Sequence, residues 1–463
     1  MIKWTILALI CCEIVAASVF WGAVHVWMWT ILIVASWIIL GLSELAKIRA
    51  KEYFRIPYCI GIVLTLFLVS LTLQQIWNVQ VTLPIPLSLQ SSLQEMGAKA
   101  EIPSIINKYQ AKLALYQWVI PVAAFLAVPF VLSARRHLYI LMISIVAICG
   151  LQGFYGILQA LSTTDPCPFF ATPDKQGTVG GTYVCRNTYA CFLAMGVPLS
   201  LGLLVELARR HGGISMKHGL QKNPWLPGIF VIFLLMILMI LGIFLSLSRG
   251  GVVCLCAGSL LFVVLLHKFS TSSSAQSRMW YLLVPLPPLV YLWLIDLDPL
   301  WGRFSDTALG GVGRWSLCAV AWQIGKHHWL LGCGGGCFSY AFNIYKPPEL
   351  LENYRYAHND FLQFFAEYGI VSSVLLAAFL VLWCYIVIRR PRKWIPAGQI
   401  ISPGIWCGSL ASLAVLFLHG LVDFSLYIPG HRLLGAVLMG VLLVTTYRKN
   451  SVVLKKEDIT CSS

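Results

Sequence analysis

Long apolar runs are the feature that most constrains this chain. About twelve segments are close to 20 residues long and hold few charges. A lipid bilayer has a hydrocarbon core about 30 Å thick, which an α-helix crosses with roughly 20 apolar residues. Of the 463 residues, 59% are hydrophobic and 11% are charged, which is more apolar surface than a soluble domain can bury. The sequence therefore predicts an all-α polytopic membrane protein with about 12 transmembrane helices.

The expected crossings are distributed over the whole chain. We place them at residues 5–21, 26–45, 56–76, 113–132, 138–160, 188–207, 225–247, 250–267, 279–296, 369–388, 401–422 and 431–447. The first run has the composition of a signal peptide, but Glu13 interrupts it and no small-residue cleavage site follows. We interpret it as a retained helix.

The distribution of basic residues predicts the orientation, because cytoplasmic loops of membrane proteins are enriched in Lys and Arg. If the N-terminus is cytoplasmic, twelve crossings place 21 of the 33 Lys and Arg residues on the inner side, and the C-terminus lies there too. The net charge of +15 is then mostly a consequence of topology, and no nucleic-acid partner is expected.

Three segments on the predicted outer face are long enough to hold structure, namely residues 77–112, 161–187 and 297–368. The largest contains "GRWSLCAVAWQIGKHHW", in which Trp315, Cys318, Ala319 and Trp322 share one helical face. This pattern predicts a helix in the plane of the membrane interface. A glycine-rich turn, "LGCGGGCF", follows it. Loops of this length are often functional.

The fifteen cysteines do not indicate a disulfide framework, because most of them lie inside predicted helices, where Cys behaves as a small hydrophobic residue. Cys167 and Cys185 on the outer side close a loop of suitable size for a disulfide if that compartment is oxidising. Cys333 and Cys337 are a weaker candidate pair. The sequence leaves both pairings open.

Three arginines beside glycines or short polar residues lie on the outer side, where topology normally places few basic residues. They are Arg249 in "SLSRGG", Arg314 in "GGVGRWSL" and Arg186 in "GTYVCRNTYACF". Each could be an ordinary surface or snorkelling arginine. Together they indicate an anion site, because the guanidinium group donates paired hydrogen bonds to phosphate and stays charged.

No metal or other cofactor is expected for such a site. The sequence has no acidic cluster that resembles a magnesium site, and the histidine pair in "KHHW" is too isolated to indicate zinc.

The stretch "YAHNDFLQFFAEYG" carries His358, Asn359 and Asp360 directly before an apolar run. One interpretation is a helix start, capped by Asn359 or Asp360, with an incidental histidine. The functional interpretation is that His358 takes the proton from an attacking sugar hydroxyl. In "LHGLVDFSLYIPGHR", His419 and Asp423 are four residues apart on one helix face. They either pair with each other or line a site.

These segments resemble the O-antigen ligase and O-antigen polymerase superfamily of bacterial envelope proteins. The resemblance rests on "GTYVCRNTYACFLAMGVPLSLGLL", "SLSRGG", "GGVGRWSLCAVAWQI", "LGCGGGCFSY", "YAHNDFLQFFAEYGIV" and "HGLVDFSLYIP", which occur in the family's order over roughly residues 177–430. The cysteines of "LGCGGGC" depart from the family pattern. The resemblance divides the chain into N-terminal helices, 1–160, and a ligase-like core, 161–463.

The resemblance implies a C-type glycosyltransferase architecture, with an outer-face cavity covered by the long loop. The donor would be a glycan on undecaprenyl pyrophosphate, and transfer would be metal-independent and inverting. Arg249 and Arg314 would hold the pyrophosphate, with Arg186 as a third candidate, and His358 would be the base. Five further residues are expected to line the site: Asn187, Asn359, Asp360, His419 and Asp423.

The expected function is transfer of a finished glycan to lipid A–core at the periplasmic face of the bacterial inner membrane. A polymerase acting on a lipid-linked repeat unit, or a transferase to protein hydroxyls, would share the donor chemistry. A flippase or exporter of lipid-linked glycans belongs to another class. It would need polar groups at mid-membrane depth, of which Glu13 is the clearest example here.

Overall fold

The computed structural model describes residues 1–50, 56–77, 82–84, 101–132, 134–162, 179–210, 226–269, 307–347, 350, 352–389 and 403–447. The α-helices are α1 (Ile2–Val19), α2 (Val26–Ala50), α3 (Tyr58–Trp77), α5 (Lys108–Gln117), α6 (Val119–Val131), α7 (Arg135–Leu161), α8 (Arg186–Arg210), α9 (Leu226–Leu245), α10 (Arg249–Phe269), α14 (Thr307–His327), α15 (Phe338–Tyr345), α16 (Asp360–Arg389), α17 (Pro403–Gly420) and α18 (Pro429–Tyr447). Short 3-10 helices are η1 (Trp21–Ala23) and η4 (Ser425–Tyr427).

The protein is a multi-pass membrane protein. Within the described residues, ten helical spans are long and apolar enough to cross a bilayer, one of them formed by α5 and α6 together (Lys108–Val131), and Pro429–Val444 is a shorter apolar helix. Each predicted crossing coincides with one of these helices, except 279–296, which lies outside the described residues. The orientation of the helices in the membrane stays a prediction.

A small antiparallel ribbon within residues 77–112 departs from the all-α expectation. Strands β1 (Thr82–Pro84) and β2 (Glu101–Pro103) pair in it.

The predicted crossing 113–132 is two helices, because α5 ends at Gln117 and α6 begins at Val119. Pro121 has no amide hydrogen to donate to the carbonyl group of Gln117, four residues earlier, and its ring crowds that carbonyl. α5 also begins earlier than expected, after Asn107, whose Oδ1 accepts hydrogen bonds from Tyr109 N and Gln110 N, both at 3.1 Å. The proline and the cap together fix both limits of α5.

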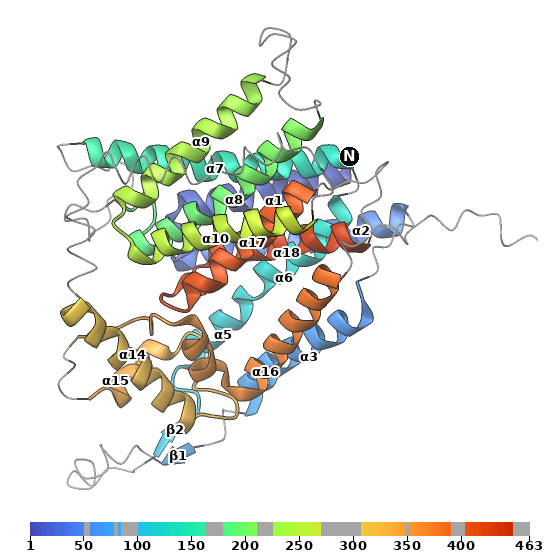
Figure 1. Cartoon of the computed structure of the whole chain (residues 1–463). Helices are drawn as coiled ribbons and strands as arrows, with labels where there is room; N and C mark the ends of the chain where they lie inside the picture. The colour runs from blue at the N-terminus through green and yellow to red at the C-terminus, as the bar shows by residue number, and fades with distance from the viewer. Residues whose placement is uncertain are drawn as a thin grey trace, which may run out of the picture.

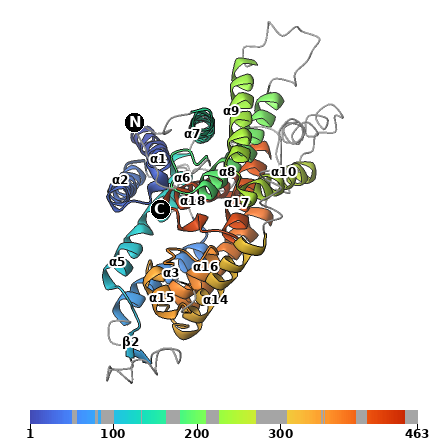
Figure 2. The ribbon, with the colours of Figure 1, turned by 90° about the vertical axis from the view of Figure 1, so that its left-hand side faces the viewer.

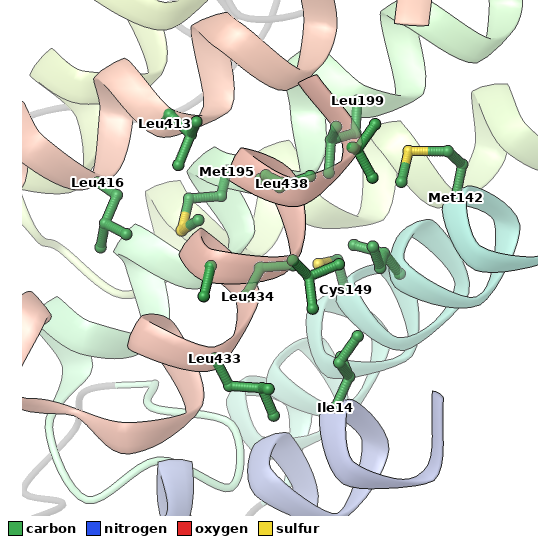
Figure 3. Packing of buried hydrophobic residues seen from close by; sticks show 14 of the residues in the cluster. Ile14, Met142, Cys149, Met195, Leu199, Leu413, Leu416, Leu433, Leu434 and Leu438 are labelled. Atoms are coloured by element: carbon green, nitrogen blue, oxygen red, sulfur yellow. The ribbon is translucent and has the colours of Figure 1, made fainter. Parts of the chain in front are cut away.

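The interior of the main bundle is apolar and closely packed. Figure 3 shows buried side chains from α1, α7, α8, α17 and α18 in one continuous cluster. α8 and α17 approach each other most closely through glycines. A Cβ on Gly404 would lie 2.6 Å from Gly202 O, and one on Gly408 would lie 2.5 Å from Pro198 O. Small residues at such contacts allow backbones in a membrane to pack with extensive van der Waals contact.

Helices α3 and α16 form a separate pair beside this bundle (Figure 1). A buried hydrogen bond joins Ser70 Oγ and Ser372 Oγ at 2.9 Å. The turn between α9 and α10 and the connection between α17 and α18 lie at the same end of the molecule as α14 and α15 (Figure 1). Figure 2 views this end directly, with α14, α15 and α16 below the bundle. The candidate site lies at this end.

The glycine-rich turn after α14 interlocks with a break in α16. The backbone of α16 departs from helical geometry at Gly369, where φ is 68° and ψ is −176°. A Cβ there would lie 2.4 Å from Leu330 O, and one on Gly332 would lie 2.3 Å from the Glu367 carbonyl. Cys333 N donates to Ala366 O at 2.9 Å. Glycine is required at both positions because a side chain would collide with the opposite backbone.

The cysteine expectations have different outcomes. Cys333 and Cys337 are free thiols, so the weaker candidate disulfide is absent. Instead, Cys337 Sγ donates to Asn107 O at 3.3 Å and attaches the turn to the start of α5. Cys167 lies outside the described residues, so its pairing with Cys185 stays a prediction.

The predicted interfacial helix is α14, and most of its predicted face is exposed. Trp315 is 78% and Trp322 is 49% exposed, and Ala319 is exposed as well. Cys318 lies at the border of this face, with its Sγ 3.8 Å from Ala357 O. The position of α14 in the plane of the membrane stays a prediction.

Candidate active site

Asp423 is the residue at which the candidate site residues meet. It lies in the connection between α17 and α18 and is 2% exposed. His358 Nδ1 donates to its Oδ1 at 3.1 Å, and Asn187 Nδ2 donates to its Oδ2 at 2.6 Å. Arg314 Nη2 lies 3.9 Å from the same Oδ2. One carboxylate thus joins side chains from the start of α8, from α14 and from the segment before α16. We call these four residues the Asp423 cluster.

The electrostatics of the cluster keep Asp423 ionised. Burial alone would raise the pKa of this carboxyl group. The hydrogen bond from His358, together with the charges of His358, His419 and Arg314, outweighs burial and lowers the pKa below its ordinary value. A carboxylate only accepts hydrogen bonds, so the hydrogen of the neutral imidazole is on Nδ1. His358 Nε2 is therefore the basic nitrogen.

His358 is held in an unusual backbone conformation. Its φ is 51°, in the left-handed region that residues with a side chain rarely adopt. Its ring meets the Phe424 ring edge-on at a centroid distance of 5.0 Å. The Tyr356 ring stacks on the same Phe424 ring, with the two centroids 4.2 Å apart. The side chain of His358 is 24% exposed, so a substrate can reach it. Such strained residues are frequent at functional sites.

The two residues after His358 have structural partners. Asn359 caps α16, because its Oδ1 accepts from Leu362 N at 3.0 Å, while its Nδ2 donates to Leu421 O at 3.0 Å. Asp360 is buried, and its Oδ2 accepts from Leu426 N at 2.8 Å. The helix-start interpretation of "HND" is therefore correct for Asn359, and Asp360 fixes the connection that carries Asp423.

Two further predicted residues, Arg249 and His419, lie beside the cluster. Ser248 Oγ donates to Asn187 Oδ1 at 2.9 Å and lies directly before Arg249, the first residue of α10. A Cβ on Gly250 would lie 3.3 Å from His419 Nε2. His419 is fully buried, and its Nδ1 shares a hydrogen bond with Ser425 Oγ at 2.7 Å. The backbone thus places both residues next to the cluster.

Arg186 is the first residue of α8 and directly precedes Asn187. The structure brings His358, Arg314, Asn187 and Asp423 into one cluster by direct contacts. It places Arg249, Arg186 and His419 beside that cluster. Binding of a pyrophosphate by the arginines stays a prediction.

A comparison with protein families identifies the central part of the chain. The model of the O-antigen ligase family matches residues 234–377. These residues form an O-antigen ligase family domain. Members of this family are membrane enzymes that transfer glycans, as ligases or polymerases. None of the curated proteins compared with the chain matches it.

The O-antigen ligase domain contains part of the cluster. Arg314 and His358 of the cluster, and Arg249 beside it, lie within residues 234–377. Asn187 and Asp423 lie on either side of the matched range, in α8 and in the connection after α17. The cluster therefore joins the histidine and the arginine of the domain to two residues that lie outside it.

An apolar cavity of about 550 Å³ extends from the ligase domain into the helices beside it. Its walls come from α3, α6, α14, α16, α17 and α18, and include Phe67, Phe125, Trp322, Phe361, Leu416 and Met439. Polar and charged residues also line it, among them Asp360, Tyr427 and Arg432. Asp360 Oδ1 and Arg432 Nε are buried there with no hydrogen-bond partner among the described residues.

Some residues of the site were missed by sequence reasoning although they lie in the quoted motifs. Ser248, Ser425 and Phe424 are in "SLSRGG" and "HGLVDFSLYIP", but a serine or phenylalanine beside a membrane helix carries no signal of its own. Glu367, in "YAHNDFLQFFAEYG", offered one signal, because a carboxylate within an apolar run is costly and usually has a role.

Within the described residues, no group of three or more His, Cys, Asp or Glu side chains could hold a metal ion. The metal-independence of the reaction stays a prediction.

Proposed function

We propose that the protein is an O-antigen ligase-like glycosyltransferase that moves a glycan from undecaprenyl pyrophosphate to lipid A–core at the periplasmic face of the inner membrane. The observation that carries this proposal is the His358–Asp423 pair with Arg314 beside it. The pair supplies a base whose proton-accepting nitrogen is defined, and the arginine supplies fixed positive charge at the same place.

In the proposed reaction, Nε2 of His358 takes the proton of an acceptor sugar hydroxyl while the hydroxyl oxygen attacks the anomeric carbon. The bond from that carbon to the pyrophosphate oxygen breaks, and undecaprenyl pyrophosphate leaves with the electron pair. Asp423 accepts from Nδ1 and stabilises the imidazolium that forms. A positioned base of this kind contributes about 10²–10⁴-fold to the rate.

The leaving group needs positive charge more than it needs a proton, because a pyrophosphate is already a weak base. Arg314 is 45% exposed, and its guanidinium lies at the outer limit of ion pairing with Asp423, so it has donors to offer to an incoming anion. Arg249 and Arg186, beside the cluster, are proposed to share this task.

The apolar cavity supports a lipid-linked substrate. Its volume of about 550 Å³ is within the range of ligand pockets, and its walls are the aromatic and aliphatic side chains that a hydrocarbon chain packs against. Tyr427 lines this cavity, four residues after Asp423. A chain in the cavity would thus place its polar head near the cluster.

The test is transfer by the purified full chain in EDTA, with a lipid-linked donor and with lipid A–core or a lipid-linked repeat unit offered separately. The expected product is glycosylated lipid A–core from the wild type and much less from His358→Ala. A ladder of products on the carrier lipid would show that the protein is a polymerase and not a ligase. Movement of the donor across a vesicle bilayer without transfer to either acceptor would overturn the proposed transferase activity and favour a flippase.

A further inference from the structure

Glu367 is a buried carboxylate that the proposed reaction does not use. It lies in α16 and is 1% exposed. Its Oε1 accepts from Phe338 N and Gln363 Nε2, both at 3.2 Å. Its Oε2 accepts from Gly336 N at 2.8 Å and from the Tyr427 hydroxyl at 3.0 Å. All four partners are donors in this arrangement, which is what a carboxylate, able only to accept, requires when it is buried.

One arm of this network leads to His358. Gln363, which donates to Glu367, also accepts from Ala357 N at 2.9 Å through its Oε1. The amide group of Gln363 is thus held at both ends. Ala357 directly precedes His358, whose left-handed backbone needs support from its surroundings. The carboxylate therefore acts on the backbone that aims the imidazole.

A second arm leads to Asp423. Tyr427 is the last residue of η4 and lies four residues after Asp423 in the same connection. Its hydroxyl donates to Glu367, and its ring lies 6.2 Å from that of Tyr356, in the segment before His358. This contact, together with the hydrogen bond from Leu426 N to Asp360 Oδ2, positions η4 and with it the connection that carries Asp423.

The third arm explains why the glycine-rich turn lies here. Gly336 N and Phe338 N both point at the carboxylate, and Gly336 has a φ of +69° that glycine adopts without strain. The turn therefore serves as a backbone cradle that holds Glu367 in place.

We propose that Glu367 is a positioning residue that aligns His358 with Asp423. By fixing the segment before His358 and the connection after Asp423 to one another, it sets the 3.1 Å hydrogen bond between these two side chains. The proposal rests on the proposed function, in which His358 is the base. Glu367 has a positioning role and not a catalytic one, because it touches neither His358 nor any predicted substrate group.

The direct test is Glu367→Gln. The NH₂ group of the glutamine would face the N–H group of Gly336 or Phe338, and a backbone N–H can only donate a hydrogen bond. We expect kcat to fall about 100-fold, because a misplacement of about 1 Å has that effect on a catalytic group, while donor affinity changes less than about twofold. Tyr427→Phe removes only the arm toward Asp423 and keeps the ring. It should fold as the wild type does and lose a smaller factor of kcat. An unchanged kcat in both variants would overturn the proposal.

The background of His358→Ala separates positioning from a general structural role. If Glu367 acts through His358, adding Glu367→Gln to His358→Ala should leave the residual rate within about twofold, because the group to be positioned is gone. An equal fractional loss in both backgrounds would mean that Glu367 only stabilises the fold, and would reject the proposal.

Ser372→Ala is the matched control. Ser372 lies in the same helix beyond the Gly369 break, and it is buried and bonded to Ser70 Oγ. Its loss should lower thermal stability by an amount similar to that of Tyr427→Phe without changing kcat. A comparable loss of kcat in Ser372→Ala would mean that any weakening of α16 impairs transfer.

A readout without transfer keeps the proposal separate from the proposed function. The rate of His358 modification by diethyl pyrocarbonate, followed by mass spectrometry, reports how the imidazole is held. We expect the modification rate of His358 in Glu367→Gln to differ from the wild-type rate and to match the rate in Asp423→Asn. A wild-type rate in Glu367→Gln would overturn the positioning role, whereas failure of the wild type to transfer any glycan would overturn only the proposed function.

Discussion

The interior of the main bundle and the end that carries the Asp423 cluster are stabilised in different ways. α8 and α17 meet through glycine backbones and buried apolar side chains. At the other region, buried carboxylates gather donors from distant segments, as Asp423 does with His358 and Asn187. Apolar packing tolerates many sequences of similar volume, whereas a hydrogen-bonded cluster depends on individual atoms. The bundle should therefore respond to volume changes with stability, and the site end should respond to single-atom changes with activity.

The largest expected effect is on turnover at the site end. His358→Ala should lower kcat by about 10²–10⁴-fold, because it removes the proposed base, while donor binding stays within about threefold. Single-turnover transfer and equilibrium donor binding measure the two quantities. Full activity in this variant would show that His358 is not the base. It would also contradict the expectation that single-atom changes at the site end alter activity.

The end that carries α14 and α15 should also be sensitive to acid through His328, which is buried after α14, 3.1 Å from the Tyr345 hydroxyl. Burial, followed by the charge of His327, lowers the pKa of His328 to about 4. In the unfolded chain a histidine titrates near about 6.5. Between these pH values only the unfolded state binds the proton, so stability is complete above the unfolded pKa and is lost as pH falls toward 4.

The loss approaches about 3 kcal/mol at pH 4. Hydrogen exchange of α14 and α15 between pH 7 and pH 4 measures it. His328→Gln retains an amide for Tyr345 and has no proton to bind, so its stability should change much less over this range. An equal pH dependence in the variant would assign the effect to another group.

Loss of an arginine should affect binding more than turnover. Arg314→Ala should weaken donor binding by about 1.5–3 kcal/mol, the range for hydrogen bonds to charged groups. Arg314→Lys keeps the charge but not the fork and should recover part of the loss. Calorimetry or donor-dependent transfer kinetics provides the measurement. A pure kcat effect with unchanged donor affinity would contradict the assigned role.

The smallest expected effect on function comes from the bundle. Gly408→Val should cost about 1–3 kcal/mol of stability through overpacking against α8, with kcat unchanged in the folded fraction. Gly41→Ala is the control, because a Cβ at Gly41 would meet no described atom within 4 Å beyond its own turn of helix. Thermal unfolding in detergent compares the two. Retained stability in Gly408→Val would show that this contact is looser than its geometry indicates.

The sequence predicted the helices well and the contacts between them less well. Apolar runs predict crossings because the bilayer fixes their length, and the runs in the described residues coincide with helices. The break at Trp118 followed from Pro121 but was not predicted. Motif and topology placed His358, Arg314 and Asp423 on one face. That Asp423 pairs with His358 and Asn187, more than with His419 four residues away, depends on the tertiary path of the connection after α17, which periodicity does not encode.

The place of Asp423 in the chain has a consequence for biosynthesis. It lies between the last two described helices, whereas Asn187 lies before the middle of the chain and His358 well after it. A nascent protein inserted into the membrane from its N-terminus thus has the histidine and the arginines long before it has the carboxylate that organises them. The cluster is complete only when the α17–α18 hairpin has emerged from the ribosome and docked, so a product truncated before this hairpin remains without an assembled centre.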